Sequence, residues 1–179
     1  MTSGDWVSSS ASYVAPRHDG QRDAWTEEAK ARGEQGSQRI VIAGEVPAPP
    51  EVADLLGVAA GTPVVVRRRV MYLGEAAVEL TDTYYPLGIA AGTRLAGTAK
   101  IPGGAVTLLA TMGHTARRVH EEVYARVPDD AERSALALAA DEPVLCLTRV
   151  TEDESAPFQV DVSVFPATGQ RLRYELRIG

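Results

Sequence analysis

The sequence predicts an α+β domain, a mostly antiparallel sheet flanked by helices. Runs of β-branched and alternating residues recur along the 179 residues, and turns join most of them. Helical segments interrupt these runs at only three or four points, which differs from the regular strand–helix alternation of a parallel sheet. With 45% hydrophobic residues, the chain is large enough for one real core. No internal repeat and no second core is apparent.

The first residues of the chain are expected to lie outside this core. Residues 1–24 are polar and are predicted to form a linker or a frayed end. A short helix over 23–32 follows and is stopped by Gly33. Trp25 is expected to anchor this helix to the body of the domain.

Two elements precede the middle of the chain. A strand is predicted over 39–45 and a helix over 51–56. Pro49-Pro50 opens this helix and Gly57 caps it, in agreement with the preferences of helix starts and helix ends. A β-hairpin is then predicted between Pro63 and Pro86, with its turn at Leu73-Gly74-Glu75.

After the hairpin, a loop over 88–102 leads into further helices and strands. Asp129 begins a segment with an acidic first turn and an apolar stripe, which predicts a helix. The last segment alternates strictly between apolar and charged residues, as a half-buried strand does. The expected elements are a helix over 104–112 ended by Gly113, a strand over 119–127 that stops at Pro128, a helix over 129–138, and strands over 144–151, 158–165 and 171–178.

The arginines of the hairpin are the first candidate for a binding site. If the turn is centred on its glycine, Arg69 faces Glu79 across the ladder, and Arg67 faces Thr81. Because side chains alternate along a strand, Arg67 and Arg69 share a face and Arg68 points the other way. Two guanidinium groups and a carboxylate can hold a small anionic, hydroxylated ligand. The alternative is a cross-strand ion pair on a solvated face, worth roughly a few tenths of a kcal/mol.

A second candidate is the pair Gly103-Gly104, which follows Pro102 at a predicted helix start. Two glycines there can expose backbone N–H groups that receive an anion. A tight turn from loop to helix is the competing explanation.

No catalytic, metal or cofactor site is predicted, and a non-enzymatic domain is expected. The chain has no nucleophile motif centred on Ser, Cys or Thr, no phosphate-binding loop and no dinucleotide fingerprint. The three histidines, His18, His114 and His120, lack the spacing of a zinc site. Cys146 is the single cysteine and lies in an apolar run, as a buried hydrophobic residue would.

Charge and hydropathy limit the possible partners. The formal net charge is -6 and the pI about 5.1, which argues against nucleic-acid binding by this chain alone, because that needs clustered positive charge. No apolar run has the length of a membrane span, and the N-terminus has no secretory pattern. We therefore expect a cytoplasmic chain without a membrane partner.

A series of short motifs runs along the chain in a specific order. They are Leu55-Leu-Gly-Val, Gly61-Thr-Pro-Val-Val-Val-Arg-Arg-Arg, Gly74, Val78-Glu79, Tyr84-Tyr-Pro86, Gly113, Glu121-Glu-Val-Tyr-Ala-Arg126, Glu132, Leu138, Pro143-Val-Leu-Cys-Leu-Thr-Arg149 and Tyr174. This order resembles the UTRA effector-binding domain of the HutC-type branch of GntR-family transcription regulators. The resemblance covers residues 37–178 and implies the chorismate lyase-like fold, a mostly antiparallel sheet flanked by helices.

The resemblance implies a ligand site on the hairpin. In that family two arginines, and a glutamate ten residues after the second, hold the phosphate or other polar groups of the effector. Arg67, Arg69 and Glu79 match this pattern with its spacing. Asp161 lies near a position where relatives place a polar ligand contact, and Arg149 matches an arginine that is either a ligand contact or structural.

One departure from the family concerns the type of effector. Members that bind sugar phosphates have a serine and a tyrosine at the start of the helix after the hairpin. This chain has Gly103, Gly104 and Ala105 there, and this loss of hydroxyl groups argues against a sugar-phosphate effector.

The resemblance also implies a division of the chain. Regulators of this kind begin with a winged helix-turn-helix domain, of which Gly4-Asp-Trp-Val-Ser-Ser9 resembles the last wing strand. Residues 1–36 are therefore expected to be a linker with a remnant of that strand, and residues 37–179 the effector-binding domain. DNA would be contacted only through the missing domain, which is either cut away or naturally absent.

The function implied is that of an effector-sensing and dimerisation domain of a GntR-family regulator. A small anionic metabolite would bind to a homodimer and modulate DNA binding. Two alternatives stay open. The chain is a stand-alone enzyme on a chorismate lyase-like scaffold, with Glu79 as base or electrostatic guide, or it is a partner module that forms mixed dimers with a full-length regulator.

Overall fold

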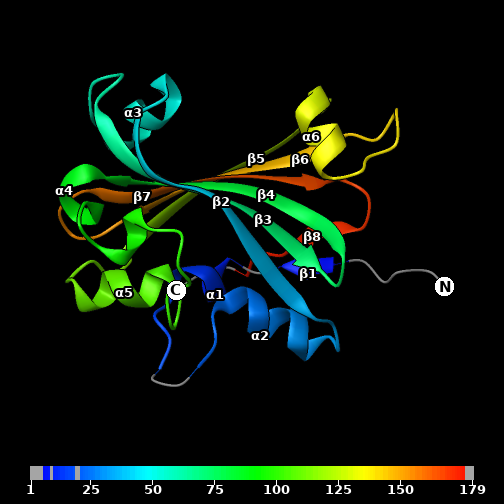
Figure 1. Cartoon of the computed structure of the whole chain (residues 1–179), viewed down its shortest axis with the longest axis horizontal. Helices are drawn as coiled ribbons and strands as arrows, with labels where there is room; N and C mark the ends of the chain where they lie inside the picture. The colour runs from blue at the N-terminus through cyan, green and yellow to red at the C-terminus, as the bar shows by residue number, and fades with distance from the viewer. Residues whose placement is uncertain (1–5, 9, 19–20, 176–179) are drawn as a thin grey trace.

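The centre of the structure is a six-stranded antiparallel sheet (Figure 1). The structure is a computed structural model, and it describes residues 6–8, 10–18 and 21–175. The predicted α+β fold on a mostly antiparallel sheet is confirmed. In spatial order the strands are β2 (Gly36–Pro47), β3 (Pro63–Leu73), β4 (Ala76–Pro86), β7 (Pro157–Pro166), β6 (Val144–Glu152) and β5 (Arg118–Arg126).

Two stretches of chain build the two halves of this sheet. β2, β3 and β4 follow one another along the chain and pair as neighbours, and so do β5, β6 and β7. The halves join where β7 pairs with β4. Residues that are about 80 positions apart in the sequence, such as Thr81 and Ser163, thereby come into direct register.

Helices cover both faces of the sheet (Figure 1). One side carries α3 (Pro50–Leu56) and α6 (Asp130–Ala135). The other side carries α1 (Ala11–Val14), α2 (Ala24–Ala31) and α5 (Ala105–Thr111). The connection from β4 to α5 adds α4 (Leu87–Ala90) and the 3-10 turn η1 (Arg94–Ala96). No helix in the described part of the chain is long and apolar enough to cross a membrane.

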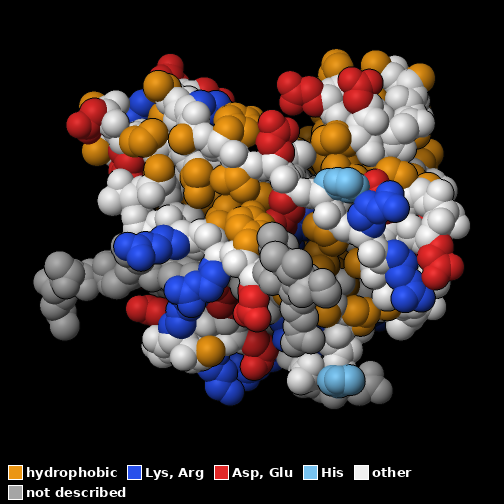
Figure 2. Space-filling view, turned by 180° about the vertical axis from the view of Figure 1, so that it is seen from behind, with side chains coloured by type: hydrophobic (Ala, Val, Ile, Leu, Met, Phe, Trp, Pro, Cys, Tyr) orange, Lys and Arg blue, Asp and Glu red, His pale blue; other side chains and the backbone are white. Residues whose placement is uncertain are grey.

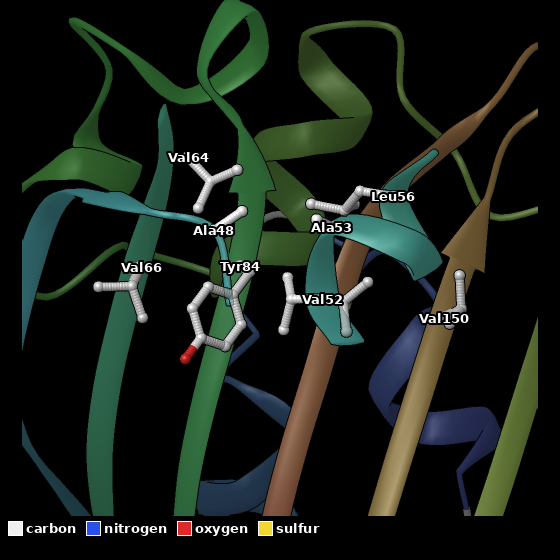
Figure 3. Packing of buried hydrophobic residues seen from close by; sticks show 9 residues of the cluster. Ala48, Val52, Ala53, Leu56, Val64, Val66, Tyr84 and Val150 are labelled. Atoms are coloured by element: carbon white, nitrogen blue, oxygen red, sulfur yellow. The ribbon is translucent and has the colours of Figure 1, made fainter. Parts of the chain in front are cut away.

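The predicted helix after Pro49 forms and covers one face of the sheet. Its first residue is Pro50, whose missing N–H is not needed there, and it ends at a left-handed Gly57. Val52 and Leu56, one turn apart, are buried against Tyr84 and other apolar residues of the sheet (Figure 3). Burial of each such side chain stabilises the fold by about 1.5–3 kcal/mol.

The opposite face is apolar only at one end. Val65, Tyr85 and Phe158 pack there against Leu95 and Leu109 of the covering η1 and α5. Further along the same strands the face becomes polar, although it stays covered. Among the residues whose burial is described, the buried polar or charged ones lie on β3, β4, β6 and β7, and they are Arg67, Thr81, Thr83, Arg149, Thr151, Gln159, Asp161 and Ser163.

The predicted helix with Trp25 is present as α2 and lies on the start of β2. Its N-cap Asp23 accepts a hydrogen bond from the Thr26 N–H at 3.0 Å. Trp25 is buried, as predicted, and its Nε1 donates to the carbonyl of Ser37 at 3.1 Å. A Cβ atom on Gly36 would approach the Ala29 side chain to 2.6 Å, so this close contact between helix and strand needs glycine.

Several predicted boundaries differ from the structure. The predicted loop 88–102 contains α4 and η1, short elements that a composition-based prediction overlooks. The predicted helix 129–138 ends at Ala135, because the backbone leaves the helical region and Ala137 has a φ of 52°. Its start was correct, since Asp129 and Glu132 form a reciprocal capping box.

The predicted last strand, 171–178, is mostly not a strand. Only β8 (Gln170–Leu172) forms, and it pairs in parallel with β1 (Trp6–Ser8) in a separate two-stranded sheet. Residues 173–175 are not in a strand, and 176–178 lie outside the described residues. An alternating sequence has two distinct faces, but it forms a strand only where a partner strand is present. The partner here is β1, which has only three residues, so β8 is equally short.

The described part of the N-terminal segment contains two short elements of regular structure. It contains β1 and α1, both within the predicted linker 1–36. Of the predicted wing-strand remnant, residues 6–8 pair with β8, whereas Gly4, Asp5 and Ser9 lie outside the described residues. The division into 1–36 and 37–179 stays a prediction.

Candidate ligand-binding site

The predicted register of the hairpin was wrong by two residues. Arg69 lies opposite Thr81, and Arg67 lies opposite Thr83, whereas Glu79 lies opposite Met71. The turn is shifted, because Leu73 pairs with Ala76, and an irregularity between Met71 and Tyr72 adds one more residue on β4. A shift of two leaves every side chain on its predicted face, so Arg67, Arg69 and Glu79 still share one face.

These residues line a cavity of about 120 Å³ on the polar part of the sheet. The sheet provides its floor, while α1, α2 and the start of α5 provide its other walls. A cavity of this size has room for a small molecule rather than for a single water. The sequence-predicted site residues all line it, and they are Arg67, Arg69, Glu79, Gly103, Gly104 and Asp161.

Arg67 lies in the floor but is engaged by the backbone of the loop. Its side chain donates to the carbonyls of Arg94 at 3.0 Å, Leu95 at 3.2 Å and Ala99 at 3.4 Å, and also to that of Gly97. Burial lowers the pKa of Arg67, and the nearby Arg69 contributes to this. With 5% of its surface exposed, it does not form the solvated ion pair considered above.

Arg69 has fewer hydrogen-bond partners than Arg67. Its NH2 group donates to Thr83 Oγ1 at 2.7 Å, and no carboxylate of the described residues forms a salt bridge with it. Its Nε is buried and has no hydrogen-bond partner among the described residues. A buried donor without a partner costs about 1–3 kcal/mol, so an acceptor on a ligand would be stabilised there.

Asp161 sits near the middle of the floor with its carboxylate satisfied by neutral groups. Thr83 Oγ1 donates to Oδ1 at 2.6 Å, and Gln159 Nε2 donates to Oδ2 at 2.7 Å. Since Thr83 also accepts from Arg69, a hydrogen-bonded chain links the arginine to the carboxylate. The Gln159 Oε1 atom, fixed by this orientation as an acceptor, has no partner among the described residues.

Glu79 lies beside this chain in a cluster of hydroxyl groups. Its Oε1 accepts from Thr81 Oγ1 at 2.6 Å and from Ser163 Oγ at 2.8 Å. Burial raises the pKa of Glu79, although these hydrogen bonds and the charges of Arg69 and Arg149 act in the opposite direction. The neutral form of this carboxyl is therefore favoured more than in water.

Arg149 lies next to Asp161 in the ladder and is 8% exposed. Its Nε donates to Glu121 Oε1 at 2.5 Å. Burial acts to lower the pKa of Arg149, but the charges of Asp161 and Glu121 raise it overall. Burial also opposes ionisation of Glu121, whose pKa is nevertheless lowered by hydrogen bonds with Ser10 and Arg149 and by the arginine's charge.

Gly103 and Gly104 form a tight turn into α5. Their φ angles are 72° and 86°, values that glycine adopts without strain. The Gly104 N–H donates to the Ile101 carbonyl at 3.0 Å. The prediction that this amide receives an anion was therefore wrong. At this position the turn explanation applies, and the pair contributes a close backbone wall to the cavity.

Sequence reasoning missed two parts of the site. One is the polar row Gln159, Asp161 and Ser163, of which only Asp161 was singled out. Polar residues alternating with valine usually indicate a solvated face, and covering helices bury this one. The other is the N-terminal segment, whose Ser12, Tyr13, Ala15 and Arg17 line the cavity. Composition alone predicted a linker there.

The chemistry that this arrangement supports is binding. Fixed guanidinium donors, hydroxyls and carboxyls line one small cavity, as in ligand pockets that use a few placed polar groups. Among the described residues, no group of three or more His, Cys, Asp or Glu side chains could hold a metal ion.

The fold and the cavity together define an α+β domain of the chorismate lyase-like class with a polar pocket on one sheet face. The chain belongs to the UTRA domain family, whose model matches residues 31–170.

A curated relative supports this membership. The chain is 30% identical over 154 residues to an uncharacterized HTH-type transcriptional regulator of Streptomyces coelicolor, SCO4628. The match covers 84% of this chain and 57% of the regulator, so the chain spans just over half the length of that relative.

Solved structures with the same fold include effector domains. The effector domain of PhnF from Mycobacterium smegmatis superimposes with a TM-score of 0.73 at 24% identity, covering 91% of this chain and 98% of that domain. The C-terminal domain of the histidine utilization repressor from Pseudomonas syringae pv. tomato gives 0.66 at 19% identity, covering 81% and 99%. At these identities the similarity concerns the fold.

Proposed function

We propose that this chain is the effector-sensing and dimerisation domain of a GntR-family transcription regulator and that its effector is a small anionic metabolite. The observation that carries the proposal is Arg69, whose Nε is buried without a partner among the described residues, in the lining of the cavity. Membership of the UTRA family and the similarity to effector domains support a sensing role. No specific observation favours the enzyme or the mixed-dimer alternative.

The donors around the cavity indicate which part of an effector they would bind. Arg69 has an unused donor, and a guanidinium forms its strongest hydrogen bonds with carboxylate or phosphate oxygens. At the start of α5, the first hydroxyl is that of Thr107, which donates to the Gly103 carbonyl at 2.8 Å. The anionic group would therefore bind to arginine rather than to hydroxyls of the helix start.

DNA would be read by a separate domain in such a regulator, because this chain is acidic, with a net charge of -6. A homodimer would place two such domains on one operator. Effector binding shifts the equilibrium between arrangements of the dimer only if the effector has different affinities for them. A cytoplasmic location follows from this role.

The experiment that tests the proposal compares two adjacent arginines. Inorganic phosphate, glycerol 3-phosphate and malonate would be screened by thermal shift, and the strongest binder measured by calorimetry. Arg69→Ala should weaken binding by about tenfold to a hundredfold, the value of a charge-assisted hydrogen bond.

Arg68→Ala is the matched control, since Arg68 lies on the other face and pairs with Asp82 at 2.6 Å. It should leave the affinity unchanged. Equal affinity of the Arg69 variant and the wild type for the strongest binder would contradict the assignment of the cavity.

A further inference from the structure

Residues 10–17, here called the N-terminal arm, form part of the cavity although they precede the family match at 31–170. The arm contains α1 and contributes Ser12, Tyr13, Ala15 and Arg17 to the lining. In the sequence it precedes α2, whose N-cap Asp23 and first-turn Trp25 also line the cavity. The arm is thus a wall of the site, opposite a floor that belongs to the sheet.

Specific contacts hold the arm in this position. Tyr13 OH donates to Glu28 Oε2 of α2 at 2.5 Å, and the Arg17 N–H donates to Thr107 Oγ1 of α5 at 3.0 Å. The second contact involves the hydroxyl that also bonds the Gly103 carbonyl, so the arm is attached to the tight turn beside the cavity.

Arg149 connects the arm to the floor. Its NH2 group donates to Ser10 Oγ at 3.1 Å, and its guanidinium carbon lies 5.8 Å from the centre of the Tyr13 ring. On its other side it neighbours Asp161 in the ladder and interacts electrostatically with Asp161 and Glu79. One buried cation therefore contacts the arm and interacts electrostatically with the acidic residues of the floor.

We propose that docking of the N-terminal arm against the effector site depends on a bound ligand. Arg149 is the positioning residue that couples the arm to the floor of the site. This rests on the proposed function. A ligand in the cavity would contact the docked arm, so docking raises ligand affinity. By reciprocity the ligand stabilises the docked arm by the same factor. Because the arm leads toward the N-terminal end of the chain, effector occupancy would be transmitted in that direction.

The test measures amide hydrogen exchange of the arm in the whole chain. Inorganic phosphate and malonate serve as probes, and thermal shift reports whether each binds. A bound probe should slow exchange of the peptide covering residues 10–17 by about fivefold or more. Tyr13→Leu, which removes the ring beside Arg149 and the bond to Glu28, should speed that exchange and weaken probe binding by a similar factor.

Two variants separate coupling from general destabilisation. Tyr13→Phe keeps the ring near Arg149 but loses the hydroxyl bond to Glu28, so its loss of affinity and its faster exchange should both be smaller than those of Tyr13→Leu. Tyr72→Leu, outside the cavity lining, should change neither the exchange of the arm nor the affinity. Since Tyr13 is only half-buried, its variants are expected to fold.

The outcomes distinguish the two proposals. A probe that raises the melting temperature without slowing exchange in residues 10–17 overturns the role of the arm and leaves the effector site intact. Equal loss of affinity in Tyr13→Leu and Tyr72→Leu also overturns it. If neither probe binds to the wild type, the anion site and the role of the arm both fail.

Discussion

At the scale of the residue, three consecutive arginines show how strand alternation determines chemistry. Arg68 is exposed on the face that α3 covers elsewhere, and it pairs with Asp82 through both Nε and NH2, at 2.8 and 2.6 Å. Arg67 is buried on the opposite face and bonds four carbonyls of the segment 94–99. Arg69 shares that side but keeps a buried donor without a partner among the described residues. Only the third has capacity left for a ligand anion.

Glu79 gives a prediction of pH dependence at the same scale. Burial raises the pKa of Glu79 above the ordinary 4.5 of a glutamate in the unfolded chain. At pH values between 4.5 and the pKa of Glu79 in the folded state, the native state therefore binds more protons than the unfolded chain. The wild type therefore loses stability as pH rises through this window, and this loss persists above it. Glu79→Gln, which stays neutral, should be more stable than wild type at pH 7, with the difference vanishing toward pH 4.

Urea unfolding at a series of pH values would measure this difference. Glu75→Gln, at the exposed hairpin turn, is the matched control and should follow the wild-type curve. A Glu79→Gln variant that is less stable than wild type at pH 7 would contradict the effect of burial.

At the scale of the element, the sequence predicted which face a side chain occupies better than where an element ends. Alternation placed Arg67, Arg69 and Glu79 together correctly, because a register error of two residues does not change the face. It could not reveal the extra residue on β4 near Met71, which depends on how the turn closes. It also assigned a long last strand, because no local pattern shows that its partner β1 has only three residues.

The loop between η1 and α5 depends on a strand residue for its shape. Arg67 binds carbonyls from Arg94 to Ala99, and few local helical bonds hold this segment. Arg67→Met should leave the buried Leu95 carbonyl and the partly buried Gly97 carbonyl without the arginine's hydrogen bonds, and should lower the free energy of unfolding by roughly 2–3 kcal/mol. Chemical denaturation would measure the loss. Arg94→Ala, which keeps its carbonyl and changes only an exposed side chain, should cost much less. Similar losses in both variants would contradict this account.

At the scale of the whole molecule, the site exists only because distant segments meet. The floor joins β3 and β4 to β7 and β6, and the N-terminal arm closes it from another direction. The sequence indicated Arg67, Arg69 and Glu79 because they lie close together on one hairpin. It did not indicate Gln159, Ser163 or the arm, because their relation to the hairpin is created by sheet order and by covering helices.

The surface of the molecule supports a prediction about assembly. β5 is an edge strand of the sheet, and an edge leaves backbone groups unpaired. Val123 and Tyr124 on this strand and Val127 just after it are 40%, 47% and 77% exposed. Figure 2 shows hydrophobic side chains grouped on the face seen from behind. We expect a second copy of the chain to cover this edge in the proposed homodimer.

Sedimentation equilibrium would test this assembly against the chain mass of 19.1 kDa. The wild type should sediment at twice that mass, and Val123→Glu should shift it toward the monomer, because a carboxylate in an apolar contact loses its hydration. Val41→Glu is the matched control, since Val41 is 49% exposed on β2 at the opposite edge of the sheet. If Val41→Glu dissociates the dimer and Val123→Glu does not, the interface lies at the other edge, and a monomeric wild type would contradict the dimer itself.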